Sequence, residues 1–364
     1  MALVFTVIAV ALVFEYINGF HDTANSIATV VSTKVLTPRQ AVTMAACTNL
    51  LGAMWGTAVA KTITSGLIDT KVITMTSDII ICALIGAIVW NLITWWFGLP
   101  SSSSHALIGG LCGSAIAASH HNWRVIIWSQ PDAKHWWLGK GLLWKVIVPM
   151  VTSPLAGFFL GALIMALLYF ALRNRRPQRV NRFFGVAQMF SAAGMGFMHG
   201  TNDAQKTMGI MALTLLGATT AGDFEHLPAS LHFLRTVQHG KDLEIALWIK
   251  IVCALTMAAG TAVGGWRIIK TLGHKMVKLH PINGFAAETS SATVIFTATQ
   301  LGIPVSTTHN ITAAIMGVGC AKRLNAIKWS VVERIIWAWV LTIPVSAMIA
   351  YGLVRLFELI GWTR

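Results

Sequence analysis

The amino-acid sequence predicts an all-α, polytopic membrane protein built from two inverted repeats, with about 10–12 transmembrane or re-entrant helices and broken helices at a central site. Three observations predict this fold: an apolar composition, apolar runs interrupted by polar residues, and short motifs that occur twice in the same order. Together they indicate helices in lipid that surround a polar centre.

The composition excludes an ordinary soluble enzyme. Of the 364 residues, 55% are hydrophobic and only 11% are charged, whereas soluble domains carry about 25% charged residues. The net charge of +14 would suggest nucleic acid as a partner of a soluble protein. Here the basic residues lie mainly between apolar runs, where they set orientation in the bilayer. The five cysteines lie in apolar stretches without a CxxC pair, which indicates buried, inert thiols.

Several apolar runs are too short to cross a membrane, since a full span needs about 20 apolar residues. The runs 19–33, 184–198 and 204–217 are short and interrupted by polar residues or glycine, which predicts broken or re-entrant helices. The run 2–17 has no basic leader and no cleavage signature, so we interpret it as a first helix. The complete series of runs is 2–17, 19–33, 41–60, 79–98, 103–119, 142–171, 184–198, 204–217, 246–264, 285–301, 304–320 and 331–357.

Four motifs occur in both halves of the chain in the same order. One short match would be chance, but four in order, two of them at the same offset of 204 residues, indicate a duplicated chain. The matched segments are 19–26 with 200–207, 56–59 with 260–263, 98–105 with 302–309 and, more weakly, 152–154 with 342–344.

The duplication divides one integral membrane domain into a first repeat, 1–172, a basic linker, 173–182, and a second repeat, 183–364. Five arginines in the ten linker residues predict a cytoplasmic position. In an inverted arrangement both termini lie on the other, external side, which fits the absence of Lys and Arg from the first 33 residues. A parallel duplication would carry the same motifs. The sequence offset between matched motifs changes along the chain, which places extra residues around 120–140 in the first repeat and around 218–245 in the second.

Two acidic residues, Asp22 and Asp203, occupy matched positions in apolar surroundings. A carboxylate at mid-membrane costs roughly 2.5–3.5 kcal/mol on insertion scales, so the pair favours a site for a small cation or a proton. Asn25 and Ser26 follow Asp22 by three and four residues and share its helical face. The alternative role is that each aspartate caps a helix at a break. Capping a helix and binding an ion are compatible.

The second matched pair is a Pro-x-Ser-Ser/Thr-Ser/Thr-His turn. Proline suits the first turn of a helix, where free N–H groups and the helix dipole attract anions. One such turn would be an ordinary N-cap, but two brought together can enclose a tetrahedral oxyanion. For His105 and His309, which end the turns, we expect a structural hydrogen bond rather than a proton relay. The expected anion ligands are Ser102, Ser103, Ser104, Ser306, Thr307 and Thr308.

The repeats differ where Asn25 of the first corresponds to Lys206 of the second. An amide oxygen can coordinate a metal cation and an ammonium cannot. We therefore expect Lys206 to reduce the number of bound coupling cations, or to pair with the anion or with Asp203. Glu288 and Asn91 lie in other apolar runs and can line the pathway, although helix packing explains each equally well.

These motifs as a set resemble the inorganic phosphate transporter (PiT) family. Phe-His at 20–21 and Gln-Lys at 205–206 are similar to its bacterial low-affinity branch. The resemblance implies that the motifs gather around one central site, with phosphate at the two hydroxyl-rich turns, to which we add Lys206. It places the coupling ion at Asp22, Asn25 and Asp203, to which we add Asn91 and Glu288. Lys206 departs from the Asn of the first repeat, which weakens the expectation of two equivalent cation sites.

We therefore expect a secondary active transporter and not an enzyme. The resemblance implies import of inorganic phosphate, often as a neutral metal–phosphate complex, by symport with protons and alternating access at the repeat interface. The alternatives are coupling to sodium, transport of another oxyanion such as sulfate, a membrane-embedded hydrolase that uses Asp22 and Asp203, and a passive anion channel. No Gly-x-x-x-x-Gly-Lys-[Ser/Thr] motif is present, so ATP hydrolysis is not expected.

The expected partners are phosphate and the lipid bilayer, without nucleic acid, and homo-oligomers are compatible with the sequence. We expect no resident cofactor and no fixed structural metal. The coupling ion is a proton or sodium, and a divalent metal is a candidate companion of phosphate at Asp22, Asn25 and Asp203. The expected location is the plasma membrane, in bacteria the inner membrane, with external termini.

Overall fold

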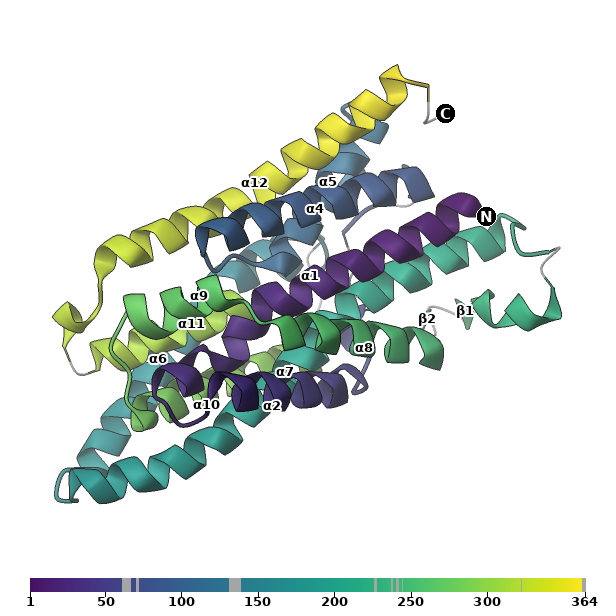
Figure 1. The fold of residues 1–364 in the computed structure, drawn as a ribbon. Coiled ribbons are helices and arrows are strands. Elements are labelled where there is room, and N and C mark those ends of the chain that lie inside the picture. Colours follow the sequence, from purple (N-terminus) through teal and green to yellow (C-terminus); the bar gives the residue numbers. More distant parts are fainter. Residues whose placement is uncertain are drawn as a thin grey trace.

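Almost all of the described chain is helical, in elements that run roughly along one long direction (Figure 1). The structure is a computed structural model that describes residues 1–60, 67–69, 72–130, 139–225, 228–236, 238–239, 242–243, 245–321 and 323–361. Parts of the segments 120–140 and 218–245, where the sequence predicts insertions, therefore lie outside the described residues.

The described residues form eleven α-helices, and the expected number of transmembrane or re-entrant helices stays a prediction. They are α1 (Ala2–Ser32), α2 (Pro38–Ala53), α4 (Ser77–Phe97), α5 (Ser103–Ala118), α6 (Val148–Leu172), α7 (Pro177–Thr220), α8 (Leu247–Val263), α9 (Trp266–Lys270), α10 (Pro281–Gln300), α11 (Thr307–Cys320) and α12 (Trp329–Leu359). The described residues also contain short 3-10 turns at Trp123–Val125, Ala229–Leu234 and Leu324–Ala326 and π-helical turns at Leu143–Ile147 and Thr271–Lys275. Two two-residue strands, β1 (Gln238–His239) and β2 (Asp242–Leu243), form an antiparallel pair.

The two helices that carry the acidic motifs are continuous. α1 passes through Asp22 and α7 through Asp203 without a break. The expectation of broken segments at 19–33, 184–198 and 204–217 is therefore wrong, as is the idea that either aspartate caps a helix. The physical reason is that one glycine costs a helix only about 1 kcal/mol, while the polar side chains at these positions find partners on neighbouring helices.

The helix breaks lie instead at the two hydroxyl-rich turns. Gly98 ends α4 with φ +65°, and Gly302, just after α10, has φ +63°. Glycine adopts this left-handed conformation without strain. The chain then passes through Pro100 or Pro304 before α5 or α11 begins. The broken helices that the sequence predicts at the centre are therefore the pairs α4–α5 and α10–α11.

Equivalent helices of the two halves make equivalent contacts. α1 packs on α8 as α7 packs on α2, and α5 packs on α12 as α11 packs on α6. α1 and α7 run in opposite directions, because Glu15 contacts Thr207 while Thr33, near the other end of α1, contacts Gln188. This antiparallel crossing at the centre is the relationship that an inverted duplication requires.

Glycines allow some of these helices to approach closely. A Cβ atom at Gly109 or Gly113 of α5 would collide with the backbone of α12 at Ile343 and Ala347. Small residues at helix contacts are typical of membrane proteins, where backbones pack directly on each other. These glycines therefore fix the position of the short helix α5, whose first turn belongs to the central site.

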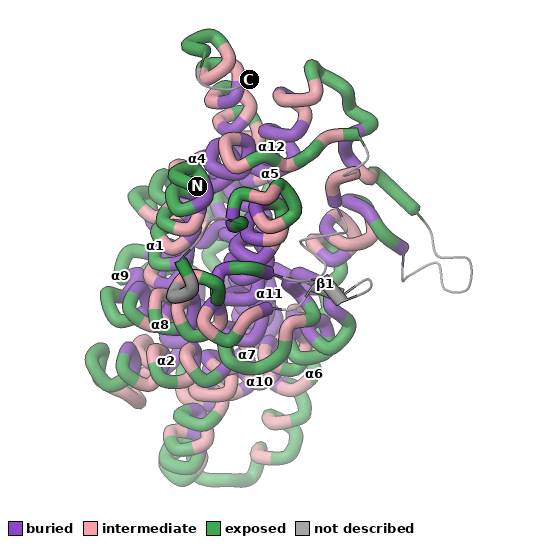
Figure 2. The backbone as a smooth tube through the Cα atoms, turned by 90° about the vertical axis from the view of Figure 1, so that its right-hand side faces the viewer, coloured by how far each residue is buried: buried purple, intermediate pink, exposed green. Residues whose placement is uncertain are grey.

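The outer surface of the bundle is apolar. α1, α4, the helix Leu143–Leu172 and α12 are each long and apolar enough to span a membrane, and α8 with Trp266–Lys275 forms a further candidate span bent by 56°. Figure 2 shows buried residues along the middle and exposed residues at the periphery. Phe170 and Phe190 are 70% and 75% exposed. Apolar exposure on this scale is expected only in contact with lipid.

Candidate substrate and ion site

Two helix N-termini meet at the centre of the protein. α5 and α11 each begin with a serine cap: the Ser102 hydroxyl accepts the backbone N–H of His105 at 3.2 Å, and the Ser306 hydroxyl accepts that of His309 at 3.1 Å. The rings of His105 and His309 contact each other edge to face, with centroids 4.9 Å apart. Matched sequence motifs thus produce matched caps, and their first turns lie side by side.

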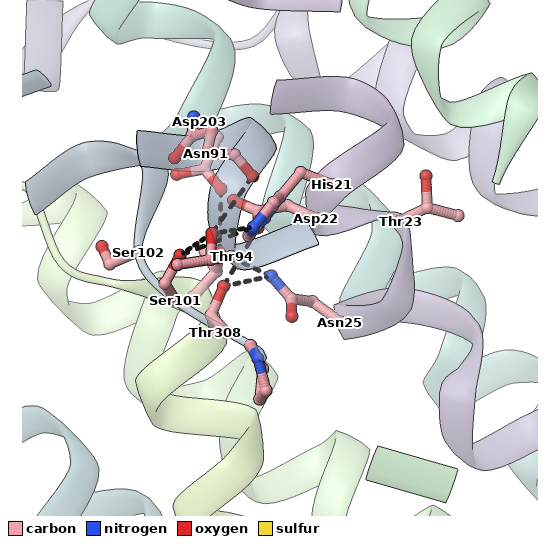
Figure 3. A network of polar contacts seen from close by, with 12 residues as sticks. His21, Asp22, Thr23, Asn25, Asn91, Thr94, Ser101, Ser102, Asp203 and Thr308 are labelled. Carbon is pink, nitrogen blue, oxygen red and sulfur yellow. Dashed lines mark hydrogen bonds and ion pairs between the residues drawn. The ribbon is translucent and has the colours of Figure 1, made fainter. Parts of the chain in front are cut away.

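The first acidic motif ties α1 to the first turn of α11. The Asp22 carboxylate accepts the hydroxyl of Thr308 at 3.2 Å and lies 2.7 Å from Nδ1 of His21. One turn later, the Asn25 amide donates to the hydroxyls of Thr307 and Thr308 at 3.2 and 2.9 Å. Figure 3 shows Asp22, Asn25 and Thr308 converging on this point.

The second acidic motif ties α7 to both turns. The Lys206 ammonium donates to Asp203 and, across the repeats, to the hydroxyl of Ser104 in α5. Asp203 also accepts the hydroxyl of Thr307 at 2.8 Å, and Nε2 of His199 lies 2.9 Å from its Oδ2. The two repeats are therefore joined by polar contacts made by the predicted site residues themselves.

Three side chains at this junction can share a cation. Asp22, His199 and Asp203 each place a ligand atom within 4.8 Å of the other two. Carboxylate oxygens and imidazole nitrogens can coordinate a divalent metal or share a proton. The residues present therefore fit a mobile coupling ion. Lys206 already supplies one positive charge to Asp203, so the two halves of the site differ electrostatically.

Several buried polar atoms at the centre have no hydrogen-bond partner within the described part of the chain. They include Oγ of Ser103, Oδ1 of Asn25 and both amide atoms of Asn91. Leaving such a group unpaired costs about 1–3 kcal/mol, so these atoms are candidate ligand-binding groups. The hydroxyl and amide donors suit an oxyanion, and Oδ1 of Asn25 suits a cation or a protonated group.

α4 contributes hydrogen bonds that hold the site residues in place. Nε2 of His21 lies 3.1 Å from the hydroxyl of Thr94, which also accepts the hydroxyl of Ser101 at 2.8 Å. Figure 3 shows Asn91, one turn earlier on α4, in the same polar region. This chain of hydrogen bonds connects the helix break to the imidazole that lies beside Asp22, and it orients that imidazole.

The structure does not bring Glu288 together with Asp22 and Asp203. Its fully buried carboxylate accepts hydrogen bonds from Thr29 of α1 and from Ser191 and Gln188 of α7. Thr29 lies one turn beyond Asn25, so Glu288 belongs to a second polar layer between the centre and the linker end of the bundle.

Sequence analysis does not identify Glu15, His199 or Asn49 as parts of this polar interior. Glu15 is fully buried and accepts the hydroxyl of Thr207, and Nδ1 of His199 lies 3.1 Å from Oδ1 of Asn49. Two signals were available. Glu15 interrupts an apolar run, and His199 precedes Asp203 by four residues, which places both on one helical face. No pattern in the sequence marks Asn49.

The chain matches the model of the phosphate transporter family over residues 18–178 and 171–350. It is 40% identical over 347 residues to a probable low-affinity inorganic phosphate transporter of Bacillus subtilis, with 95% of each chain covered. To a probable low-affinity inorganic phosphate transporter of Rhizobium meliloti it is 44% identical over 344 residues, which cover 94% of this chain and 93% of the relative.

A solved structure described as the sodium-dependent phosphate transporter superposes with a TM-score of 0.78. The superposition covers 99% of this chain and 100% of that one, at 23% sequence identity. At this identity the likeness shows a shared fold.

The family match and the relatives agree with the motifs from which we inferred the resemblance. The relatives are named as transporters of inorganic phosphate and not as enzymes, which removes the hydrolase from the alternatives. The chain therefore belongs to the phosphate transporter family, as a multi-pass helical membrane protein whose transported substrate is inorganic phosphate.

Proposed function

We propose that this chain imports phosphate by symport with protons, and that the two repeats alternate the access of the central site to the two sides of the membrane. The observation that carries the proposal is the position of Lys206. Its ammonium lies between Asp203 and Ser104, at the position that matches the amide of Asn25 in the first repeat. A fixed ammonium at Asp203 takes the place of one metal cation there, which favours protons over metal cations as the coupling ions.

Phosphate would bind between the two hydroxyl-rich turns. Its oxygens can accept hydrogen bonds from Ser103, whose hydroxyl has no partner among the described residues, from Ser104 and from Lys206. Thr307 and Thr308 of the other turn would donate to phosphate once their O–H groups leave Asp203 and Asp22. Ionic donors such as ammonium make the stronger hydrogen bonds. The hydroxyls of Ser102 and Ser306 accept capping bonds, and their hydrogens remain available to phosphate.

The site needs a conformational change before phosphate can enter. Asp22, Asp203 and Lys206 are 3%, 1% and 2% exposed, so the centre is closed to both sides in this conformation. A cavity of about 420 Å³ extends from about one to about four helical turns beyond Lys206 toward the end of α7, lined in part by Gly209, Ile210 and Leu111. It supports an access route from the end of the bundle that holds the termini.

The charge distribution supports an orientation with external termini and a cytoplasmic linker. Both termini lie at one end of the bundle, and the link between α6 and α7 lies at the other (Figure 1). Basic residues in short loops favour the cytoplasmic side of a membrane. Those at the linker end include Lys34, Arg39, Arg173, Arg175, Arg176, Lys275, Lys278, Arg323 and Lys328.

A second candidate is co-transport of phosphate with a divalent metal. The group of Asp22, His199 and Asp203 favours it, because it combines carboxylate and imidazole ligands beside the proposed phosphate donors. Sodium coupling remains an alternative for this chain, because the structural relative is described as sodium-dependent. Transport of another tetrahedral oxyanion would use the same donors.

Uptake of labelled phosphate by reconstituted vesicles tests the proposal when the proton and sodium gradients are varied independently. We expect accumulation to follow the proton gradient, to vanish with a proton ionophore, and to survive replacement of sodium by a large organic cation. The opposite pattern would replace protons by sodium, and indifference to both gradients would indicate a passive channel. Competition by sulfate measures oxyanion selectivity, and chelation of divalent metals tests the metal–phosphate complex.

A further inference from the structure

We propose that Glu15 carries the proton that is transported with phosphate. The proposal rests on the proton symport proposed above and assigns its proton to one side chain. Glu15 lies on α1 seven residues before Asp22, which is about 10 Å along the helix axis, toward the end of the bundle that holds both termini. It therefore lies between that end and the phosphate site.

The surroundings of Glu15 favour a carboxyl group that gains and loses a proton. The side chain is 0% exposed. One oxygen, Oε2, accepts the hydroxyl of Thr207, and the other, Oε1, has no hydrogen-bond partner among the described residues. The Asn18 side chain lies close enough to interact with this carboxyl, and its own Oδ1 has no hydrogen-bond partner among the described residues. A proton on Oε1 would give both oxygens a partner, because the new O–H can donate to the Asn18 amide.

α7, α8 and α4 all pack on α1, and the charged and titratable groups that act on Glu15 within the described residues come from α7 and α8. α7 presents Asp203 and Lys206, and α8 presents the thiol of Cys253. Lys206 donates to Asp203 and Ser104 and makes no hydrogen bond to Glu15 in the described contacts. With Asp22 nearby, one ammonium faces three carboxyl groups, so it cannot compensate all of them when they are ionised. Glu15 has no ion-pair partner in the described contacts and keeps one oxygen, Oε1, without a hydrogen-bond donor, so it is the group that a proton neutralises best.

Lys206 couples this proton to phosphate. An ionised Glu15 attracts the ammonium and repels an incoming anion, whereas a protonated Glu15 leaves the ammonium free to bind phosphate. A proton from the external solution thus forms an O–H bond at Glu15 as phosphate binds. After the site opens inward and phosphate leaves, that bond breaks, the proton passes to water and the electron pair stays on the carboxylate. Proton and phosphate therefore move together.

Glu288 is a weaker candidate for the same role. It is equally buried, but its carboxylate already accepts hydrogen bonds from Thr29, Gln188 and Ser191. Three donors stabilise an ionised carboxylate where it stands. No ammonium contacts Glu288 in the described part of the chain, so its protonation has no direct link to phosphate through Lys206.

The test compares two transport modes of reconstituted Glu15→Gln. Exchange of labelled for unlabelled phosphate across the vesicle membrane needs no net proton movement, whereas accumulation against a phosphate gradient does. We expect Glu15→Gln to retain exchange at a rate close to that of the unmodified protein, to lose proton-driven accumulation, and to lose the dependence of its apparent KM on pH. Glu15→Asp should restore accumulation with an altered pH profile. Infrared difference spectra on phosphate binding should lose a protonated-carboxyl band in Glu15→Gln.

The matched control is Glu333→Gln, which neutralises an exposed glutamate on α12 and should leave both modes unchanged. Proton-driven accumulation by Glu15→Gln would overturn the proposal. So would loss of exchange in both Glu15→Gln and Glu15→Asp while Glu333→Gln stays active, because it would assign Glu15 a structural role. If the unmodified protein exchanges phosphate but a proton gradient does not drive accumulation, that result contradicts the proposed proton symport itself and not only the role of Glu15.

Discussion

Asp22 on α1 and Asp203 on α7 face each other where the two antiparallel helices cross, with carboxylate oxygens within 4.8 Å of one another. Two carboxylates this close repel each other unless a cation or a proton lies nearby. The protein supplies different partners on the two sides: His21 lies beside Asp22, and Lys206 beside Asp203. In the proposed mechanism the charges of phosphate, coupling ion and protein are balanced at this pair, so substitutions there test the mechanism most directly.

Asp203→Asn should affect both stability and transport. It leaves the Lys206 ammonium buried without its carboxylate partner, and breaking one side of a buried ion pair costs about 3–5 kcal/mol. We expect a lower unfolding temperature in detergent and phosphate uptake reduced by at least about tenfold. Asp22→Asn should reduce uptake with a smaller loss of stability, because that variant leaves no buried ammonium without its carboxylate partner. Equal destabilisation by the two variants would show that Lys206 does not depend on Asp203.

Lys206→Asn should change the ion that drives transport. The substitution gives the second repeat the amide that Asn25 supplies in the first, and an amide oxygen can coordinate a metal cation. We expect weaker phosphate affinity and new stimulation of uptake by sodium, measured over a range of sodium concentrations at fixed pH. Lys275→Asn, at an exposed position near the linker end, is the matched control. An unchanged ion dependence together with unchanged phosphate affinity would remove Lys206 from the site.

Ser103→Ala and Ser102→Ala should separate binding from capping. The Ser103 hydroxyl has no partner in the described structure, so its loss should raise the KM for phosphate by up to about tenfold with little change in stability. Ser102 caps α5 through the N–H of His105, and removal of such a cap costs about 1 kcal/mol of stability. Both are measured by phosphate uptake and thermal unfolding. A stability loss in Ser103→Ala with unchanged KM would reverse the two assignments.

The sequence predicts the residues of the central site better than it predicts where helices continue or break. Asp22, Asp203 and the hydroxyl-rich turns are recognisable because polar residues in apolar runs are costly and because the duplication marks them twice. The continuity of α1 and α7 could not be read from short apolar runs, since polar groups in a membrane helix are satisfied by other helices. Thr307, for example, donates to Asp203 across about a hundred positions of the chain. Glu15 carries no such mark, because one acid in a long apolar run leaves the average hydropathy of the run high.

Gly113→Ala and Gly352→Ala should shift stability in opposite directions. Alanine favours a helix over glycine by about 1 kcal/mol, and a Cβ at Gly352 of α12 meets no atom within 4 Å, so this variant should unfold at a higher temperature. A Cβ at Gly113 would collide with the backbone of Ala347. Overpacking of this kind costs about 1–3 kcal/mol, and it would push α5 away from α12. Because the first turn of α5 holds Ser104 against Lys206, Gly113→Ala should also raise the KM for phosphate, whereas Gly352→Ala should not. If Gly113→Ala lowers stability with an unchanged KM, the α5–α12 contact supports the fold without setting the position of the phosphate site.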